Sequence, residues 1–152
     1  MIHIKNKHSL LEKNTKPGKS PRQYPEFVLH SHIADYATKM FIPGISMWHT
    51  TENSTGNDTP EGRRQQAKLK FLGAKKGFPD GVIFIKRARG SNLPNILFLE
   101  LKSLVGVISA EQREMHEFLR DIGLIVEVIR TFDQFLHLIN KYEVPTREKI
   151  GI

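Results

Sequence analysis

The chain has 152 residues, of which 39% are apolar and 26% are charged, and these proportions fit one soluble globular domain rather than two. Its net charge of +7 favours a polyanionic partner, most simply a nucleic acid. The absence of cysteine excludes disulfide bonds and cysteine-ligated zinc, and it fits a reducing compartment. No apolar run is long enough to span a membrane, and the first residues lack the apolar core of a signal peptide.

Residues 1–24 are polar and basic, and the Pro and Gly among them predict a flexible N-terminal arm. The arm could follow a phosphate backbone; a terminus with no specific role is the alternative. A helix is expected from Pro25 to about Phe41, with Glu26 in its first turn, where a carboxylate stabilises the helix dipole. Its expected apolar face comprises Phe27, Leu29, Ile33, Ala34, Tyr36, Ala37 and Met40.

A short strand is expected over 45–49, and a second helix from Pro60 or Glu61 to about Leu72. The second helix and the turn after it carry a basic run that leads toward Pro79-Asp80: Arg63, Arg64, Lys68, Lys70, Lys75 and Lys76. A solvated helix face is the ordinary meaning of such charges. If they contact phosphates, they give affinity and register rather than sequence preference.

Two apolar runs, 81–86 and 96–102, are typical of buried strands, and the turn between them predicts an antiparallel hairpin. That turn is also basic, with Arg87 and Arg89. A helix from Ser109 to about Ile122 follows, with an expected apolar stripe of Met115, Phe118, Leu119 and Ile122. A strand over 124–130 and a helix over 131–142 complete the domain, which we place at 25–143 with a C-terminal tail over 144–152.

This order predicts an α/β fold with a mixed central sheet flanked by helices. The helix after Ser109 would serve as the crossover that makes strands 96–102 and 124–130 parallel neighbours. Gln112 stands three residues after Ser109, as in a capping box; alternatively, its side chain points back toward Lys102.

Asp80 and Glu100 stand at the edges of the two hairpin strands, where a charge is costly unless it pairs or binds a metal. Alternation along a strand puts Glu100 and Lys102 on one face, about 6.5 Å apart. If the strands are neighbours, both acids can reach one point, and such oxygen ligands suit Mg²⁺ or Mn²⁺. The alternative is an ordinary Glu–Lys ion pair beside a Pro-Asp-Gly turn.

The combined pattern resembles the VRR-Nuc domain, a branch of the PD-(D/E)xK nuclease superfamily with the restriction-endonuclease-like fold. The resemblance rests on Gly77-Phe-Pro-Asp80, Leu99-Glu100-Leu101-Lys102, Gly106, Ser109-Ala-Glu-Gln112 and Gly123, and it covers roughly residues 25–140. It implies that Asp80, Glu100 and the main-chain carbonyl of Leu101 bind the metal, that Lys102 is the catalytic lysine, and that Gln112 lies near the site. Glu26 matches the acid of the first helix.

The resemblance therefore implies a Mg²⁺- or Mn²⁺-dependent DNA endonuclease, acting as a homodimer on branched DNA such as Holliday junctions or flaps. We expect it in the cytoplasm of a bacterial cell or a phage-infected host. The basic residues Arg63, Arg64, Lys68, Lys75, Lys76, Arg87 and Arg89 are the expected DNA contacts. Two other classes remain open: a nucleic-acid-binding module without catalysis, and an α/β protein whose charge serves only solubility.

Overall fold

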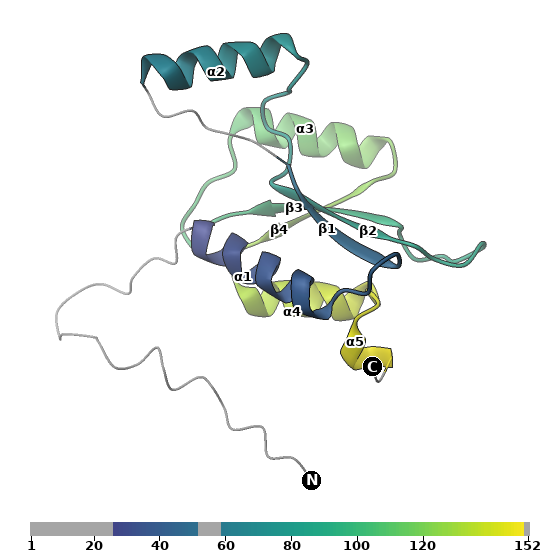
Figure 1. Ribbon diagram of the computed structural model, residues 1–152. Coiled ribbons are helices and arrows are strands. Elements are labelled where there is room, and N and C mark those ends of the chain that lie inside the picture. Colours follow the sequence, from purple (N-terminus) through teal and green to yellow (C-terminus); the bar gives the residue numbers. More distant parts are fainter. Residues whose placement is uncertain (1–25, 52–58, 151–152) are drawn as a thin grey trace, which may run out of the picture.

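A mixed four-stranded sheet is the centre of the computed structural model, which describes residues 26–51 and 59–150 (Figure 1). The strands lie in the order β1 (Ser46–Thr50), β2 (Gly81–Ile85), β3 (Ile96–Leu101) and β4 (Ile125–Ile129). β2 is antiparallel to β1 and to β3, whereas β3 and β4 are parallel. The α/β class, the hairpin and the parallel pair predicted from the sequence are therefore confirmed.

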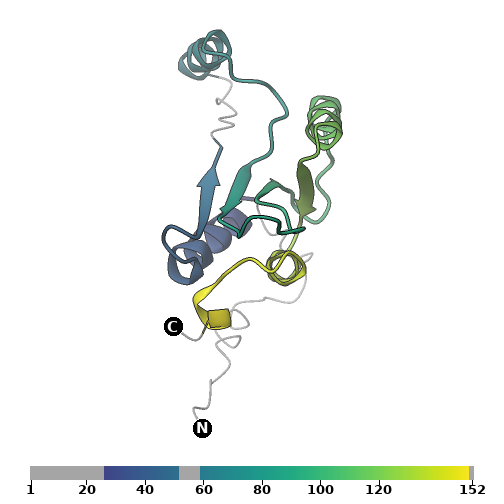
Figure 2. The same ribbon diagram turned by 90° about the vertical axis from the view of Figure 1, so that its right-hand side faces the viewer.

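Helices cover both faces of the sheet. The helices of the described residues are α1 (Glu26–Met40), α2 (Pro60–Phe71), α3 (Ala110–Asp121), α4 (Phe132–Lys141) and the short α5 (Arg147–Ile150). α1 and α4 lie side by side over one face, and α3 covers the other (Figures 1 and 2). The alternation of β3 sends Leu97, Leu99 and Leu101 into the core beneath α1 and α4, which leaves its other face for Glu100.

α2 stands apart from the sheet in both views (Figures 1 and 2). Thr59 caps its first turn by accepting the Gly62 N–H, and Gly62 is its one buried residue in the described structure. The predicted apolar residues do not reach a core: Phe71 is 89% exposed. A helix with so few apolar side chains has no stripe to bury against the sheet.

Two predicted helix faces differ from the observed ones. On α1, Phe27 is exposed while Leu29, Ile33 and Ala37 are buried. On α3, Phe118 and Ile122 are exposed, and the buried positions are His116 and Leu119. α3 is therefore rotated relative to the stripe expected from hydrophobicity.

The start of the predicted C-terminal tail, residues 144–146, packs on the domain, and residues 147–149 after it are exposed. Val144 and Thr146 are fully buried, and Thr146 forms an isolated β-bridge with Phe41. The Ser46 hydroxyl donates to the carbonyl oxygen of Pro145 at 2.9 Å. The predicted N-terminal arm, 1–24, lies outside the described residues. None of the described helices is long and apolar enough to cross a membrane.

Candidate active site

The β2–β3 register brings the two candidate acids together. Gly81 pairs with Leu99, so continuing the ladder by one residue places Asp80 opposite Glu100. Asp80 Oδ2 accepts the Leu101 N–H at 2.7 Å, and the Asp80 carbonyl accepts the Thr51 N–H at 3.0 Å. These two bonds fix the turn that enters β2, so Asp80 is held against the end of β3.

Gly81 is required at this turn by close packing. A Cβ added there would lie 2.0 Å from the Cη2 atom of Trp48, whose ring covers the turn. Any larger residue would displace either the ring or the backbone that carries Asp80. The Pro-Asp-Gly sequence is therefore both a turn and a device for placing one carboxylate.

Glu100 is completely buried and surrounded by donors. Its Oε1 atom accepts a hydrogen bond from Gln112 Nε2 and contacts Lys102 Nζ at 2.8 Å. Its Oε2 atom lies 3.2 Å from His116 Nε2. A carboxylate in such surroundings is held in one orientation, because rotating it would break contacts on both oxygens.

Glu26 reaches the same place from the start of α1. Its Oε1 atom lies 4.0 Å from Lys102 Nζ and accepts the Ser103 N–H at 3.3 Å. A Cβ added to Gly106 would lie 3.3 Å from that same oxygen, so the loop after β3 closes tightly around it. The structure thus brings together all five side chains predicted for the site: Glu26, Asp80, Glu100, Lys102 and Gln112.

The two alternatives for Gln112 are both realised. Its Oε1 atom accepts the Ser109 N–H and its main-chain N–H donates to Ser109 Oγ, which is a complete capping box. Its Nε2 group donates to Glu100 at the same time. The Gln112 side-chain amide has a donor end and an acceptor end. This one residue therefore completes the cap of α3 and also holds the Glu100 carboxylate.

His116 is the residue of this site that sequence analysis missed. It is buried on α3, one turn after Gln112, and both side chains reach Glu100. The signal was the i, i+4 spacing, which puts two polar residues on one helix face. Burial lowers the pKa of His116, and Arg120 lowers it further, so the ring is neutral at pH 7. When Nε2 carries the proton of the neutral ring, it donates to Glu100 Oε2.

The carboxyl groups of the site resist ionisation in the absence of a cation. Burial and the nearby charge of Glu100 raise the pKa of Asp80 to about 6, although the Leu101 N–H and Lys102 act in the other direction. Burial also raises the pKa of Glu100, and the contact with Lys102 offsets this only in part. Glu100 therefore forms an ion pair with Lys102 at 2.8 Å in surroundings where burial still raises the pKa of the acid.

Lys102 is charged despite its burial. Burial lowers its pKa, but the hydrogen bond and charge of Glu100, with the charges of Glu26 and Asp80, outweigh that effect and raise it overall. One ammonium group therefore faces three acids. This excess of negative charge is what a bound divalent cation would offset.

The ligand groups of this site fit Mg²⁺ or Mn²⁺, which keep waters and substrate oxygens as ligands. They fit less well a metal whose ligands all come from the protein. Within the described ranges, no three His, Asp or Glu side chains converge closely enough to hold an ion. Mg²⁺ is usually bound by one or two carboxylates, with waters and substrate phosphates at the remaining positions. Two adjacent carboxylates, with exposed basic residues on the segment that leads to Asp80, match that pattern.

The predicted basic residues divide into two groups. Arg63, Arg64, Lys68, Lys75 and Lys76 are exposed on α2 and on the segment that leads from it to Asp80. Arg87 and Arg89 follow the other end of β2, so the structure does not bring them to the acids. The Arg87 guanidinium donates to the carbonyl oxygens of Pro94 and Tyr142, which ties the hairpin to the C-terminal segment.

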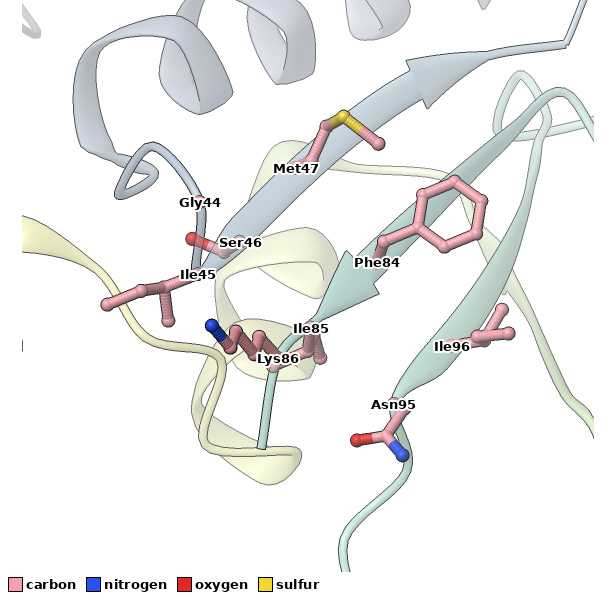
Figure 3. Close-up of a pocket in the computed structure, with 9 residues that line it drawn as sticks. All are labelled: Gly44, Ile45, Ser46, Met47, Phe84, Ile85, Lys86, Asn95 and Ile96. Atoms are coloured by element: carbon pink, nitrogen blue, oxygen red, sulfur yellow. The ribbon is translucent and has the colours of Figure 1, made fainter. Parts of the chain in front are cut away.

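A pocket of about 370 Å³ lies at that other end of the sheet, between β1 and the β2–β3 hairpin (Figure 3). Met47, Phe84 and Ile96 form much of its wall, and Lys86 stands at its rim. It contains no carboxylate or histidine, so it offers no group for hydrolysis. The acids predicted for the site lie at the opposite end of the hairpin.

The sheet order and its flanking helices place the chain among α/β proteins with a restriction-endonuclease-like fold. A solved structure described as "VRR_NUC domain protein" is similar to this chain, with a TM-score of 0.58 and 21% sequence identity. The match covers 79% of this chain and 89% of that chain, and at this identity it concerns the fold. No protein-family model matches the chain, and no curated protein matches it.

Proposed function

We propose that this chain is an endonuclease that hydrolyses phosphodiester bonds of DNA with Mg²⁺ or Mn²⁺. The observation that carries the proposal is the convergence of Asp80 and Glu100, with Lys102 in contact, at one end of the β2–β3 hairpin. The likeness in fold to a VRR_NUC domain protein supports it. Burial, with a second carboxyl group nearby, raises the pKa of Asp80 and of Glu100, and buried acids that lie close together are typical of functional sites.

In this proposal, Asp80 and Glu100 hold the metal, assisted by Glu26 and the main-chain carbonyl of Leu101. When bound, the ion supplies Lewis-acid chemistry and lowers the pKa of a coordinated water. The ammonium group of Lys102 orients the attacking water and stabilises negative charge that develops on the phosphate. Gln112 keeps Glu100 in position through its Nε2–H.

The proposed substrate is branched DNA, such as a flap or a Holliday junction, and the proposed active form is a homodimer. The exposed basic residues of α2 and of the segment after it would hold the backbone next to the site. Exposed apolar side chains on α3, Phe118 and Ile122, offer a surface for a second copy. Two sites related by a two-fold axis could cut paired strands of a junction.

The test is a cleavage panel of linear duplex, flap and four-way junction DNA, each with Mg²⁺ and with Mn²⁺. We expect metal-dependent cleavage that Asp80→Asn, Glu100→Gln and Lys102→Met each reduce by at least 10²-fold, while DNA binding persists. Glu127→Gln is the matched control, because Glu127 on β4 is an acid of the same sheet that pairs with Lys141 of α4. Undiminished cleavage by the Glu100→Gln variant would refute the assignment of this site as the active site.

The second candidate is a nucleic-acid-binding module without catalysis. The specific observation in its favour is that Lys102 Nζ already contacts Glu100 at 2.8 Å, so an ammonium group lies beside the acid without a metal. Salt-dependent DNA binding with no cleavage of any substrate in either metal would select this candidate.

A further inference from the structure

The two oxygens of Glu100 are in different surroundings. Oε1 is contacted by two donors, Lys102 Nζ and the Gln112 amide, and a carboxylate oxygen has only two lone-pair directions. Oε2 is contacted by His116 Nε2 at 3.2 Å. Oε1 is thus filled by donors, and Oε2 is the oxygen with a lone pair left for a cation.

One face of α3 supplies both the amide of Gln112 and the imidazole of His116. Gln112 and His116 are four residues apart, and Leu119, three residues after His116, is buried like His116. The positions of Gln112 and His116 along the helix axis are fixed by the capping box at Ser109, because the box sets where the helix begins. A small rotation of the helix would therefore move both contacts on Glu100 together.

We infer that His116 is a positioning residue: its Nε2–H holds Glu100 so that Oε2, and not Oε1, is presented to the metal. This inference rests on the proposed metal site. Groups that orient a metal ligand in this way typically contribute 10- to 100-fold to metal affinity. Asp80 and Lys102 complete the charged surroundings of Glu100, so neither of them is altered in the test.

The test uses two nearly isosteric substitutions, His116→Gln and His116→Met. Both remove the ring and its packing equally, but only Gln retains an N–H donor at the position of Nε2. The measured quantity is the dissociation constant of Mn²⁺ alone, from electron paramagnetic resonance of the free ion, with Glu100→Gln as the reference for a lost ligand. Leu119→Ala is the control for loss of packing on the same buried helix face.

We expect His116→Gln to bind Mn²⁺ within about threefold of the wild type, and His116→Met to bind it at least tenfold more weakly. Leu119→Ala should lower Tm and leave the affinity of the folded protein unchanged. Equal affinities of the Gln and Met variants would overturn the inference, as would a wild type that binds no Mn²⁺.

A measurement on the wild type does not depend on the folding of any variant. The ¹⁵N shifts of the His116 ring distinguish its two neutral tautomers, and we expect the Nε2–H form; the Nδ1–H form overturns the inference. A chain that binds Mn²⁺ through Glu100 but cuts no DNA would refute the proposed function and leave the role of His116 intact.

Discussion

The carboxyl group of Asp80 makes the proposed metal site sensitive to pH. Burial and Glu100 raise its pKa to about 6, so a proton and a cation compete for it near neutrality. We expect the affinity for Mn²⁺ to fall steeply as the pH drops from 7 to 5. Mn²⁺ titrations at fixed ionic strength measure this directly, and an affinity that is constant over that range would contradict it.

The same shift predicts that Asp80 destabilises the metal-free protein at neutral pH. A raised pKa means that the folded state binds more protons than the unfolded state between about pH 4 and 6, so its stability falls as the pH rises through this window. Asp80→Asn removes that penalty and can still accept the Leu101 N–H. Because Asp80 is partly exposed, we expect a gain on the order of 1 kcal/mol at pH 7.

Urea unfolding without metal, at pH 4 and at pH 7, tests this effect. The gain from Asp80→Asn should be present at pH 7 and much smaller at pH 4, where the carboxyl group is protonated in the folded state and partly protonated in the unfolded state. Asp133→Asn, an exposed acid at the start of α4, is the control and should not gain stability at pH 7.

The residues of the site differ in how far the sequence predicts them. Strand alternation predicts that Glu100 turns away from the core leucines, and Gln112 follows from its spacing to Ser109. His116 was not predicted, because a histidine on an apparently polar helix face looks like an exposed one. It is buried because Glu100 on the facing strand gives it a partner, and that pairing depends on the tertiary structure.

At the scale of elements, the segment from α2 to β2 depends on a glycine packed against the start of α3. Gly77 has φ +77°, and a Cβ there would lie 2.3 Å from the main-chain oxygen of Glu111. Gly77→Ala should therefore cost backbone strain of roughly 1–2 kcal/mol and a clash in addition. It should also move Asp80, which follows three residues later.

Gly73→Ala is the matched control for this effect. Gly73 has φ +94° but no atom near the added Cβ, so it incurs the strain without the clash. Thermal unfolding should show a larger loss of Tm for Gly77→Ala, and Mn²⁺ affinity should fall only in that variant. Equal losses of Tm would mean that the contact with α3 does not constrain the segment.

α2 offers a prediction that separates DNA binding from folding. Arg64 and Lys68 are exposed on a helix that packs little against the sheet, so Arg64→Gln with Lys68→Gln should leave Tm unchanged. DNA affinity should fall, and the slope of log K against log[salt] should become shallower by about two. Lys39→Gln, at the end of α1, is the control and should leave the slope unchanged.

The sequence patterns predict the helices but not which face of each helix is buried. Apolar spacing on α3 suggests Phe118 and Ile122 for the core, but the helix turns His116 and Leu119 inward instead. Likewise, residues 144–150 carry no strong pattern, yet Val144 is buried by contacts that arise only when α1 and α4 are side by side. Element order is local information, whereas the choice of face is set by the neighbours.

At the scale of the whole molecule, the apolar face left open on α3 predicts self-association. Phe118 and Ile122 are each 58% exposed, and covering them with a second copy removes apolar area from water. We expect a dimer by light scattering, and a monomer for Phe118→Ser with Ile122→Ser. Phe27→Ser, on the exposed start of α1, should remain dimeric. A wild-type monomer that still cuts DNA would reject the dimer as the active form.

The contact between β1 and the C-terminal segment has a consequence for biosynthesis. Ser46 bonds to Pro145, and Phe41 pairs with Thr146, so the first helix and strand are completed by residues about a hundred positions later. Such long-range closure forms late, because the intervening chain must be ordered first. During translation, residues 145 and 146 are synthesised after Glu26, Asp80, Glu100 and Lys102. The nascent chain therefore carries every acid of the site before residues 145 and 146 exist, so the contacts that complete α1 and β1 form only after the segment beyond α4 has been synthesised.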